Sequence, residues 1–189
     1  PEGKVDPDTT GVPMSDNIEI RIDNADVHGV GEIVVRHPNM FLGYYKNPEA
    51  TREASVHGWH HTGDIGYIDG DGYLYIVDRA KDMIITGGEN VSPVEVESCL
   101  SLHEGVAEVA VVGLPDERWG KIVVAFVKRR GDVTAEDLDR HCRDSGLANF
   151  RRPRRFVFVE AIPKSPVGKL LRRLLVAGEY TEERIPEHQ

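Results

Sequence analysis

The stretch Val77-Asp-Arg-Ala-Lys-Asp-Met-Ile-Ile-Thr-Gly-Gly-Glu-Asn90 divides this chain of 189 residues into two parts of unlike charge. Residues 1–78 contain 5 Lys and Arg against 14 Asp and Glu, whereas residues 79–189 contain 18 of each. The whole net charge of −9 therefore belongs to the first part. Such a shift in composition is typical of a domain boundary. We expect one domain over 1–78 and a second over 79–189.

The first part has the pattern of short strands joined by turns. Isoleucines at 18, 20 and 22 alternate with polar residues, as in a strand with one buried face. Two apolar runs, 65–68 and 73–77, flank Asp69-Gly-Asp-Gly72, whose glycines suit a hairpin turn. One short helix is expected after Asn47, a capping residue followed by Pro48.

The second part mixes helices and strands. Ser92-Pro-Val-Glu95 and Thr134-Ala-Glu-Asp137 have the composition of helix starts, with a capping box expected at Ser92. A last helix is expected over 168–177, and the tail after Tyr180 is expected to fray. Strands are expected at 82–85, 106–112, 122–127 and 156–159. The order indicates a compact α+β domain of about 100 residues.

Composition excludes several classes of protein. No apolar run approaches the roughly 20 residues of a membrane-spanning helix, and we expect no secretory signal. The acidic first part disfavours nucleic-acid binding, which needs a basic surface. Cys99 and Cys142 lack zinc-site spacing, so we expect no metal and two reduced thiols in a cytoplasmic protein. The chain opens with Pro1 rather than Met, so we expect a processed or truncated product.

Three short segments have compositions that packing alone does not require. Asp64, in Trp59-His-His-Thr-Gly-Asp64, is suited either to a vicinal diol such as ribose or to a turn that bonds its own backbone. Adjacent histidines on a strand face opposite ways, so they should not share a metal. Gly87 and Gly88 allow either close approach of a ligand to the backbone or simply a tight turn.

The third segment, Pro163-Lys-Ser-Pro-Val-Gly-Lys169, places a cation at an expected helix start, which suits a phosphate or carboxylate. A solvated loop lysine is the simpler interpretation of Lys169, and the spacing is not that of a P-loop. A basic cluster nearby is either a solvated surface or a docking surface for an anionic partner; it contains Arg151, Arg152, Arg154 and Arg155.

Taken together and in order, these segments resemble the C-terminal portion of the AMP-forming acyl- and aryl-CoA synthetases, members of the adenylate-forming superfamily. The resemblance covers roughly residues 17–178. It rests on Gly31-Glu-Ile, Gly43-Tyr44, His61-Thr-Gly-Asp64, Asp78-Arg79, Gly87-Gly-Glu-Asn-Val91, Glu95-Val-Glu97 and Gly168-Lys169. Val167 departs from the pattern, because the family often has Thr or Ser before the Gly-Lys pair.

The resemblance implies a two-step ligase. A carboxylate attacks the α-phosphate of Mg-ATP to give an acyl-adenylate and pyrophosphate, and the thiol of coenzyme A then displaces AMP. By position, Asp64 holds the ribose hydroxyls and Arg79 also contacts the nucleotide. Lys81 falls at the hinge between a large and a small domain, while Gly87 and Gly88 line the pantetheine channel. Lys169 contacts the carboxylate and α-phosphate during adenylation.

The resemblance also implies a fold and a partner. Residues 1–78 would form the last subdomain of the large domain, a partial β-barrel, and residues 79–189 the mobile small α+β domain. The family's phosphate loop, its magnesium residues and most of the acyl pocket lie upstream. We therefore expect the chain to be inactive without the N-terminal domain of the same enzyme, and ATP and Mg2+ to bind mainly there.

Two other functions remain open. The chain is alternatively a non-catalytic binding module that docks through the arginines at 151–155. It is also compatible with an enzyme that loads an adenylated acid onto a carrier protein instead of coenzyme A. Fatty, aryl and dicarboxylic acids all stay possible as substrates, with fatty acid metabolism as the expected setting.

Overall fold

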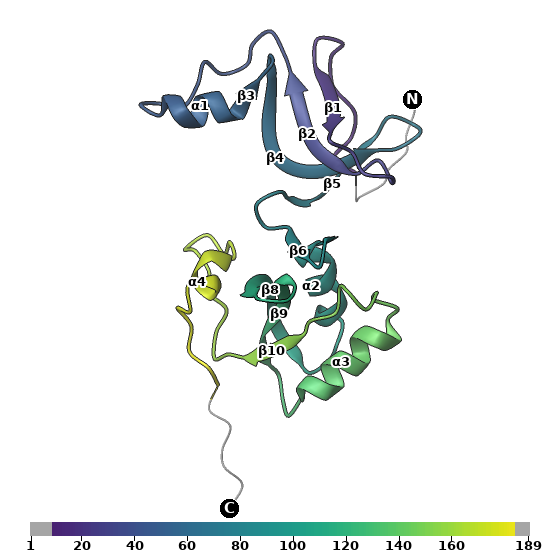
Figure 1. The fold of residues 1–189 in the computed structure, drawn as a ribbon, viewed down its shortest axis with the longest axis vertical. Helices are drawn as coiled ribbons and strands as arrows, with labels where there is room; N and C mark the ends of the chain where they lie inside the picture. The colour runs from purple at the N-terminus through teal and green to yellow at the C-terminus, as the bar shows by residue number, and fades with distance from the viewer. Residues whose placement is uncertain (1–8, 184–189) are drawn as a thin grey trace, which may run out of the picture. The chain divides into compact units, whose positions relative to one another are not determined.

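The computed structural model describes residues 9–183 and divides the chain into two compact units (Figure 1). The first unit ends at Lys81 and the second begins at Asp82. Arg79, Ala80 and Lys81 therefore lie with the first unit, although the charge pattern divides the chain after residue 78. Each unit is built around its own sheet.

The first unit is an antiparallel five-stranded sheet with one short helix, α1 (Pro48–Ala54). Four strands follow the order β1-β2-β4-β3, and the fifth, β5, also pairs with β4. The strands are β1 (Glu19–Asp23), β2 (Gly31–Arg36), β3 (Ser55–Val56), β4 (Trp59–Ile68) and β5 (Leu74–Arg79). The expected hairpin between the last two strands is confirmed, as is the Asn47 cap of α1.

The sheet of the first unit curls into a half-barrel because its longest strand is bulged. Strand β4 bends visibly in Figure 1, and the register shifts on both of its long edges, once against β2 and once against β5. Bulges of this kind sharpen the local bend and twist. Gly66 lies at one shift, where an added Cβ would come 2.2 Å from the Tyr75 carbonyl oxygen. The expected partial β-barrel is thus confirmed.

The second unit contains a three-stranded sheet and a separate hairpin. The sheet order is β10-β9-β8, with β8 antiparallel and β10 parallel to β9. Three helices accompany these strands. The elements are β6 (Ile84–Thr86), β7 (Glu89–Val91), α2 (Pro93–Ser101), β8 (Val106–Asp116), β9 (Gly120–Arg129), α3 (Ala135–Asp144), β10 (Arg155–Phe158) and α4 (Arg172–Val176). The expected α+β fold is confirmed.

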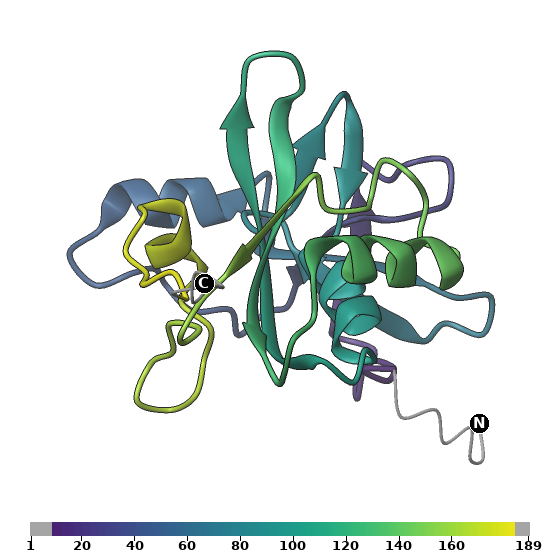
Figure 2. The same cartoon turned by 90° about the horizontal axis from the view of Figure 1, so that it is seen from below.

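Alternation along β8 and β9 gives this sheet two buried faces (Figure 2). Val111, Val123 and Ala125 pack with α2 and α3, while their neighbours Val112 and Val124 pack on the face that carries α4. Side chains on a strand alternate between faces, so an unbroken apolar run indicates a sheet covered on both sides. This double cover holds the three helices in fixed places on the sheet.

The starts of α2 and α3 follow the sequence closely. Ser92 caps α2 through its hydroxyl, which accepts from the Glu95 amide. The Glu95 carboxylate forms an ion pair with Arg151. The reciprocal capping box forms instead at α3, between Thr134 and Asp137. Short polar side chains at these positions satisfy backbone amides that a helix leaves unbonded.

Two elements begin at later residues than the sequence predicts. The last helix begins at Arg172 rather than at 168, because the residues before it form a loop closed by a bridge between Lys164 and Leu170. The strand expected at 82–85 lies at Ile84–Thr86, since the turn at Gly87 and Gly88 fixes Thr86 opposite Glu89.

The described part of the tail is held in place rather than frayed, which corrects the expectation for residues 181–183. The Glu160 amide donates to Thr181, the Glu183 amide donates to Phe158, and the Glu183 carboxylate meets the Arg129 guanidinium at 2.7 Å. That guanidinium holds the pKa of Glu183 below its ordinary value of 4.5. The rest of the expected frayed tail lies outside the described residues.

We predict that Glu183→Gln removes a pH-dependent part of the stability. A carboxylate with a lowered folded-state pKa contributes fully above 4.5, and its contribution is lost as the pH falls through the lowered value. At pH 7 the variant should lose roughly 1 kcal/mol and a few degrees of Tm, with a smaller difference at pH 3. Thermal melts at both pH values measure this, with Glu182→Gln as the control. Equal losses at both pH values would contradict it.

Candidate active site

An acid–base pair lies where β4 and β5 run side by side in the first unit. Asp64 and Arg79 are register partners, and the Arg79 Nε lies 2.9 Å from the Asp64 Oδ1. The carboxylate is mostly covered, with 23% of its side chain exposed, while the arginine is half exposed. A carboxylate has two oxygens that each accept hydrogen bonds, so this pair can bind a ligand that carries both hydroxyls and phosphate.

The backbone beside Asp64 is fixed by hydrogen bonds within β4 and between β4 and β2. The Thr62 hydroxyl donates to the Ile33 carbonyl and accepts from the Asp64 amide. Glu32 accepts from the Gly63 amide with one oxygen and lies 2.8 Å from the His61 Nδ1 with the other. The simpler interpretation, in which Asp64 bonds its own turn, is therefore replaced by an ion pair with Arg79.

The two adjacent histidines face different partners, as their strand position predicts. His61 contacts Glu32, while the His60 ring lies edge-on to Phe41 at 5.0 Å. Across residues 9–183, no group of three or more His, Cys, Asp or Glu side chains is placed to hold a metal ion.

At the junction between the units, both neighbours of Lys81 form contacts within their own unit. The Ala80 amide donates to the Gly63 carbonyl in the first unit, and the Asp82 carboxylate lies 3.9 Å from the Arg172 guanidinium in the second. Lys81 lies between them, in a turn and exposed. The contacts thus leave Lys81 as the least constrained residue of the junction.

Gly87 and Gly88 form the two-residue turn between β6 and β7. Both have positive φ, 59° and 89°, as a two-residue hairpin of this type requires. An added Cβ at Gly87 would come 2.8 Å from the Trp119 ring, whereas the space at Gly88 is open. The requirements of a tight turn are enough to explain both glycines. The space beside Gly88 is also open.

Trp119 is a candidate that the sequence analysis missed. Its carbonyl accepts from the Gly87 amide, and its ring is flanked by the guanidinium groups of Arg118 at 4.9 Å and Arg154 at 4.3 Å. Arg151 and Arg152, in contrast, are paired with Glu95 and Asp139. Two members of the basic cluster are therefore paired and Arg154 stacks beside the glycine turn, while Arg155 is exposed at the start of β10. No local pattern marks Trp119, because its partners come from distant segments.

Lys169 lies in a pinned loop before α4, not at the helix start that the sequence predicts. The Ser165 amide donates to the Lys169 carbonyl, and the Lys169 amide donates to the Ser165 hydroxyl. Gly168 reverses the chain with a φ of 83°. Within residues 9–183, the exposed Lys169 ammonium has no hydrogen bond or ion pair, whereas nearby Lys164 is bound to Glu108.

A nearly buried ion pair holds the base of this loop. The Arg172 guanidinium donates to both oxygens of Glu97 at 2.8 Å, and one of those oxygens also accepts from the Val111 amide at 2.7 Å. The two side chains are 19% and 13% exposed. Helices α2 and α4 are thereby joined across the edge of β8, three residues from Lys169.

The structure thus brings the expected residues together in local groups. Asp64 contacts Arg79, and Gly87 and Gly88 share one turn. Lys169 is free on a loop of the second unit. Each group is preformed by hydrogen bonds within its own unit.

Comparison with known proteins shows which class of protein this chain resembles. Residues 95–169 match the family described as the AMP-binding enzyme C-terminal domain. The chain is 46% identical over 165 residues to the long-chain-fatty-acid–CoA ligase FadD13 of Mycobacterium tuberculosis H37Rv, covering 86% of this chain and 33% of that protein. It is 48% identical over 145 residues to a 2-succinylbenzoate–CoA ligase of Bacillus cereus, covering 77% and 30%.

Solved structures also resemble this chain. ATP-bound MatB from Rhodopseudomonas palustris superposes with a TM-score of 0.82 at 32% identity, over 94% of this chain and 37% of that one. The o-succinylbenzoate–CoA synthetase of Bacillus subtilis, solved with an acyl-adenylate, gives a TM-score of 0.79 at 37% identity, over 89% and 35%.

The fold and these matches are those of an adenylate-forming enzyme. The chain contains a match to the AMP-binding enzyme C-terminal domain and is similar to the C-terminal portion of proteins named as acyl- and aryl-CoA ligases. It spans about a third of the length of the curated relatives it matches. No described helix is both long and apolar enough to cross a membrane.

We predict that Gly87→Ala is more destabilising than Gly88→Ala. Both substitutions place a side chain at positive φ, which costs about 1 kcal/mol, but only Gly87→Ala also drives a methyl group into the Trp119 ring. Urea unfolding should show an additional loss of about 1–2 kcal/mol for Gly87→Ala. Equal losses for the two variants would show that Trp119 does not pack on the turn.

We also predict that Arg172→Met costs about 3 kcal/mol, because it leaves the Glu97 carboxylate nearly buried without its counter-charge. Arg173→Met, at an exposed neighbouring position, should cost less than about 0.5 kcal/mol. Urea unfolding measures both. The double variant with Glu97→Gln should lose less than the two single changes added together, and additive losses would contradict a direct pair.

Proposed function

We propose that this chain supplies the C-terminal portion of an AMP-forming ligase that converts a carboxylic acid to its CoA thioester. Adenylation forms a bond between a carboxylate oxygen and the α-phosphorus of ATP and breaks the bond to pyrophosphate. The CoA thiol then attacks the acyl carbonyl and AMP leaves. The matched relatives named as CoA ligases support this reaction class.

Lys169 is the proposed catalytic residue, and its free ammonium on a pinned loop is the observation that carries the proposal. Charge builds on the α-phosphate as the carboxylate attacks, and a positioned cation stabilises that charge. A lysine that already forms an ion pair within its unit would have to break that ion pair before it could stabilise charge on the α-phosphate. Lys164 is excluded in this way by Glu108, whereas Lys169 is exposed and unpaired within residues 9–183.

Asp64 and Arg79 are the proposed nucleotide-binding pair of the first unit. Arg79 contacts one oxygen of Asp64, and the carboxylate accepts the ribose hydroxyls. The half-exposed guanidinium remains able to bind a phosphate oxygen as well. Because Thr62 and Glu32 fix the backbone on either side of Gly63, little ordering is needed when the nucleotide binds.

Lys81 is the proposed hinge between the two half-reactions. Its neighbours are bonded to different units, so a change in its backbone angles would move the second unit as one body. One orientation would deliver Lys169 for adenylation. The other would present the turn at Gly87 and Gly88 for thioester formation, which needs room for a thiol and no added cation.

Gly87 and Gly88 are the proposed lining of the pantetheine path. The open space at Gly88 and the absence of side chains on the turn suit a narrow, uncharged arm. The arginines flanking Trp119 are placed beside the same turn and would suit the phosphates at the other end of coenzyme A.

Upstream sequence would complete the ligase. Mg2+ would neutralise charge on the ATP phosphates, and the residues described here offer no cluster to hold it. We propose that the ion, the triphosphate and most of the acid are bound by the upstream portion, without which this chain is inactive.

The test uses a ligase in which this chain replaces the matching C-terminal portion of FadD13. We predict that Lys169→Ala lowers ATP–pyrophosphate exchange, the measure of adenylation, about 100-fold or more. Thioester formation from supplied acyl-adenylate should largely survive. Lys164→Ala is the matched control, because it removes a lysine of the same loop that is occupied by Glu108.

Equal loss of both half-reactions in Lys169→Ala would contradict alternation between two orientations. Unchanged adenylation would remove Lys169 from the site. Assaying coenzyme A against a phosphopantetheinyl carrier protein as acyl acceptor separates the CoA ligase from the carrier-loading alternative.

A further inference from the structure

The two cysteines of the chain lie on neighbouring helices of the second unit. Cys99 is near the end of α2 and partly exposed, while Cys142 is buried on α3. Ser145 links them, because its hydroxyl lies 2.9 Å from the Cys99 sulfur and donates to the Cys142 carbonyl at 3.0 Å. Neither thiol has a part in the proposed ligase reaction.

Burial and the neighbouring thiol both act on Cys142. The pKa of Cys142 is raised to about 12, first by burial and then by the Cys99 side chain. Both cysteines also pack in the same apolar cluster beneath the sheet.

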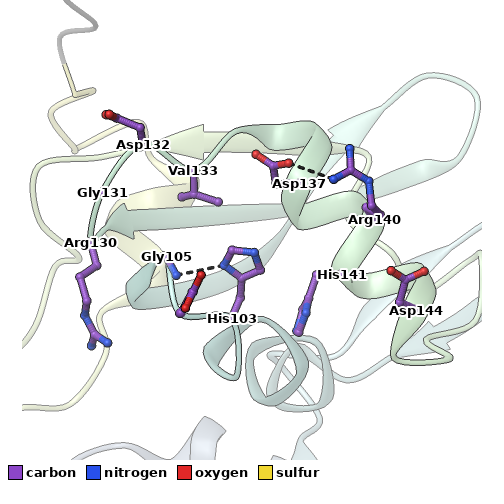
Figure 3. A pocket seen from close by; sticks show the side chains of 11 residues that line it. His103, Gly105, Arg130, Gly131, Asp132, Val133, Asp137, Arg140, His141 and Asp144 are labelled. Carbon is purple, nitrogen blue, oxygen red and sulfur yellow. Dashed lines mark hydrogen bonds and ion pairs between the residues drawn. The ribbon is translucent and has the colours of Figure 1, made fainter.

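An open hollow of about 820 Å3 lies beside α3 and is lined by residues next to the pair, not by the cysteines themselves (Figure 3). His141, which lines the hollow, directly precedes Cys142, and its Nε2 is 2.9 Å from the Cys99 carbonyl oxygen. The His141 ring meets His103 edge-on at 5.1 Å. Because Cys99 is itself partly exposed, a small polar oxidant can reach it without unfolding the helices.

We propose that Cys99 and Cys142 form an oxidative modification site, which a hydroperoxide converts to an intramolecular disulfide between α2 and α3. In the first step the Cys99 sulfur, as thiolate, attacks one peroxide oxygen. The O–O bond breaks, hydroxide leaves and takes up the thiol proton as water, and Cys99 becomes a sulfenic acid.

In the second step the Cys142 sulfur attacks the Cys99 sulfur. The S–S bond forms, the S–O bond breaks, and water leaves with the proton from Cys142. The two thiols together supply the two electrons that reduce the peroxide. This order follows from exposure, since solvent reaches Cys99 and not Cys142.

The second step should be slow near neutral pH and faster in alkali. Thiolate is the attacking form, so the rate should rise about tenfold per pH unit while Cys142 stays mostly protonated. The groups that set this are Cys99 on α2, Asp139 on α3 and Arg152 before β10, with the arginine acting against the other two.

The test treats the 189-residue chain with hydrogen peroxide at pH 8.5 and maps it by mass spectrometry without reduction. Trypsin should release residues 82–118 joined to residues 141–143, in a monomer that has lost two hydrogen atoms. In Cys142→Ala, dimedone should label Cys99, because the sulfenic acid has no partner. Cys99→Ala should leave Cys142 unmodified under the same conditions.

Separate peptides in the wild-type chain, with Cys99 oxidised to sulfinic acid and Cys142 free, would overturn the proposal. So would a disulfide-linked dimer through Cys99. The wild-type result stands without the variants, so a folding defect in either variant does not affect it. The outcome is also independent of the ligase proposal, since no nucleotide or acid is needed.

Discussion

The carboxylate of Glu97 is the point on which the second unit depends. Both of its oxygens accept from the Nη2 of Arg172, and one also accepts from the amide of Val111, so one side chain of α2 fixes β8 and the start of α4 together. A charge so nearly buried is tolerable only when its partners saturate it. The loop that carries Lys169 leads directly into Arg172, the first residue of α4. The unpaired ammonium is thus carried next to a part of the fold that this ion pair stabilises, and the proposed catalytic role requires a cation held in position.

Features that depend on neighbouring residues could be predicted from the sequence, whereas contacts between residues far apart in the sequence could not. The Asn47, Ser92 and Thr134 caps could be recognised because a cap depends on residues within one turn. The start of α4 could not, since the leucines after Gly168 have helical spacing and the contact that delays the helix is a bridge to Lys164. The partnership of Arg172 with Glu97 spans 75 residues. Trp119 was missed for the same reason, as its place beside Gly87 arises only after folding.

The family resemblance gave roles to residues whose individual patterns were weak. Asp64 and Arg79 are far apart on a hairpin, and their contact follows from the register of β4 and β5, which a bulge sets. The positive φ angles of the turn between β6 and β7 are enough to explain why glycine stands at Gly87 and Gly88. The local geometry at each of these positions is therefore compatible with the role proposed for it.

Residues 181–183 run along the end of β10, the outermost strand of the three-stranded sheet. An uncovered strand edge presents unbonded amides and carbonyls that invite pairing with another molecule. The clasp between Glu183 and Arg129 keeps this short segment on the sheet. Its consequence extends beyond folding, because the same few residues occupy hydrogen-bonding groups at the end of β10 with which another molecule could otherwise pair.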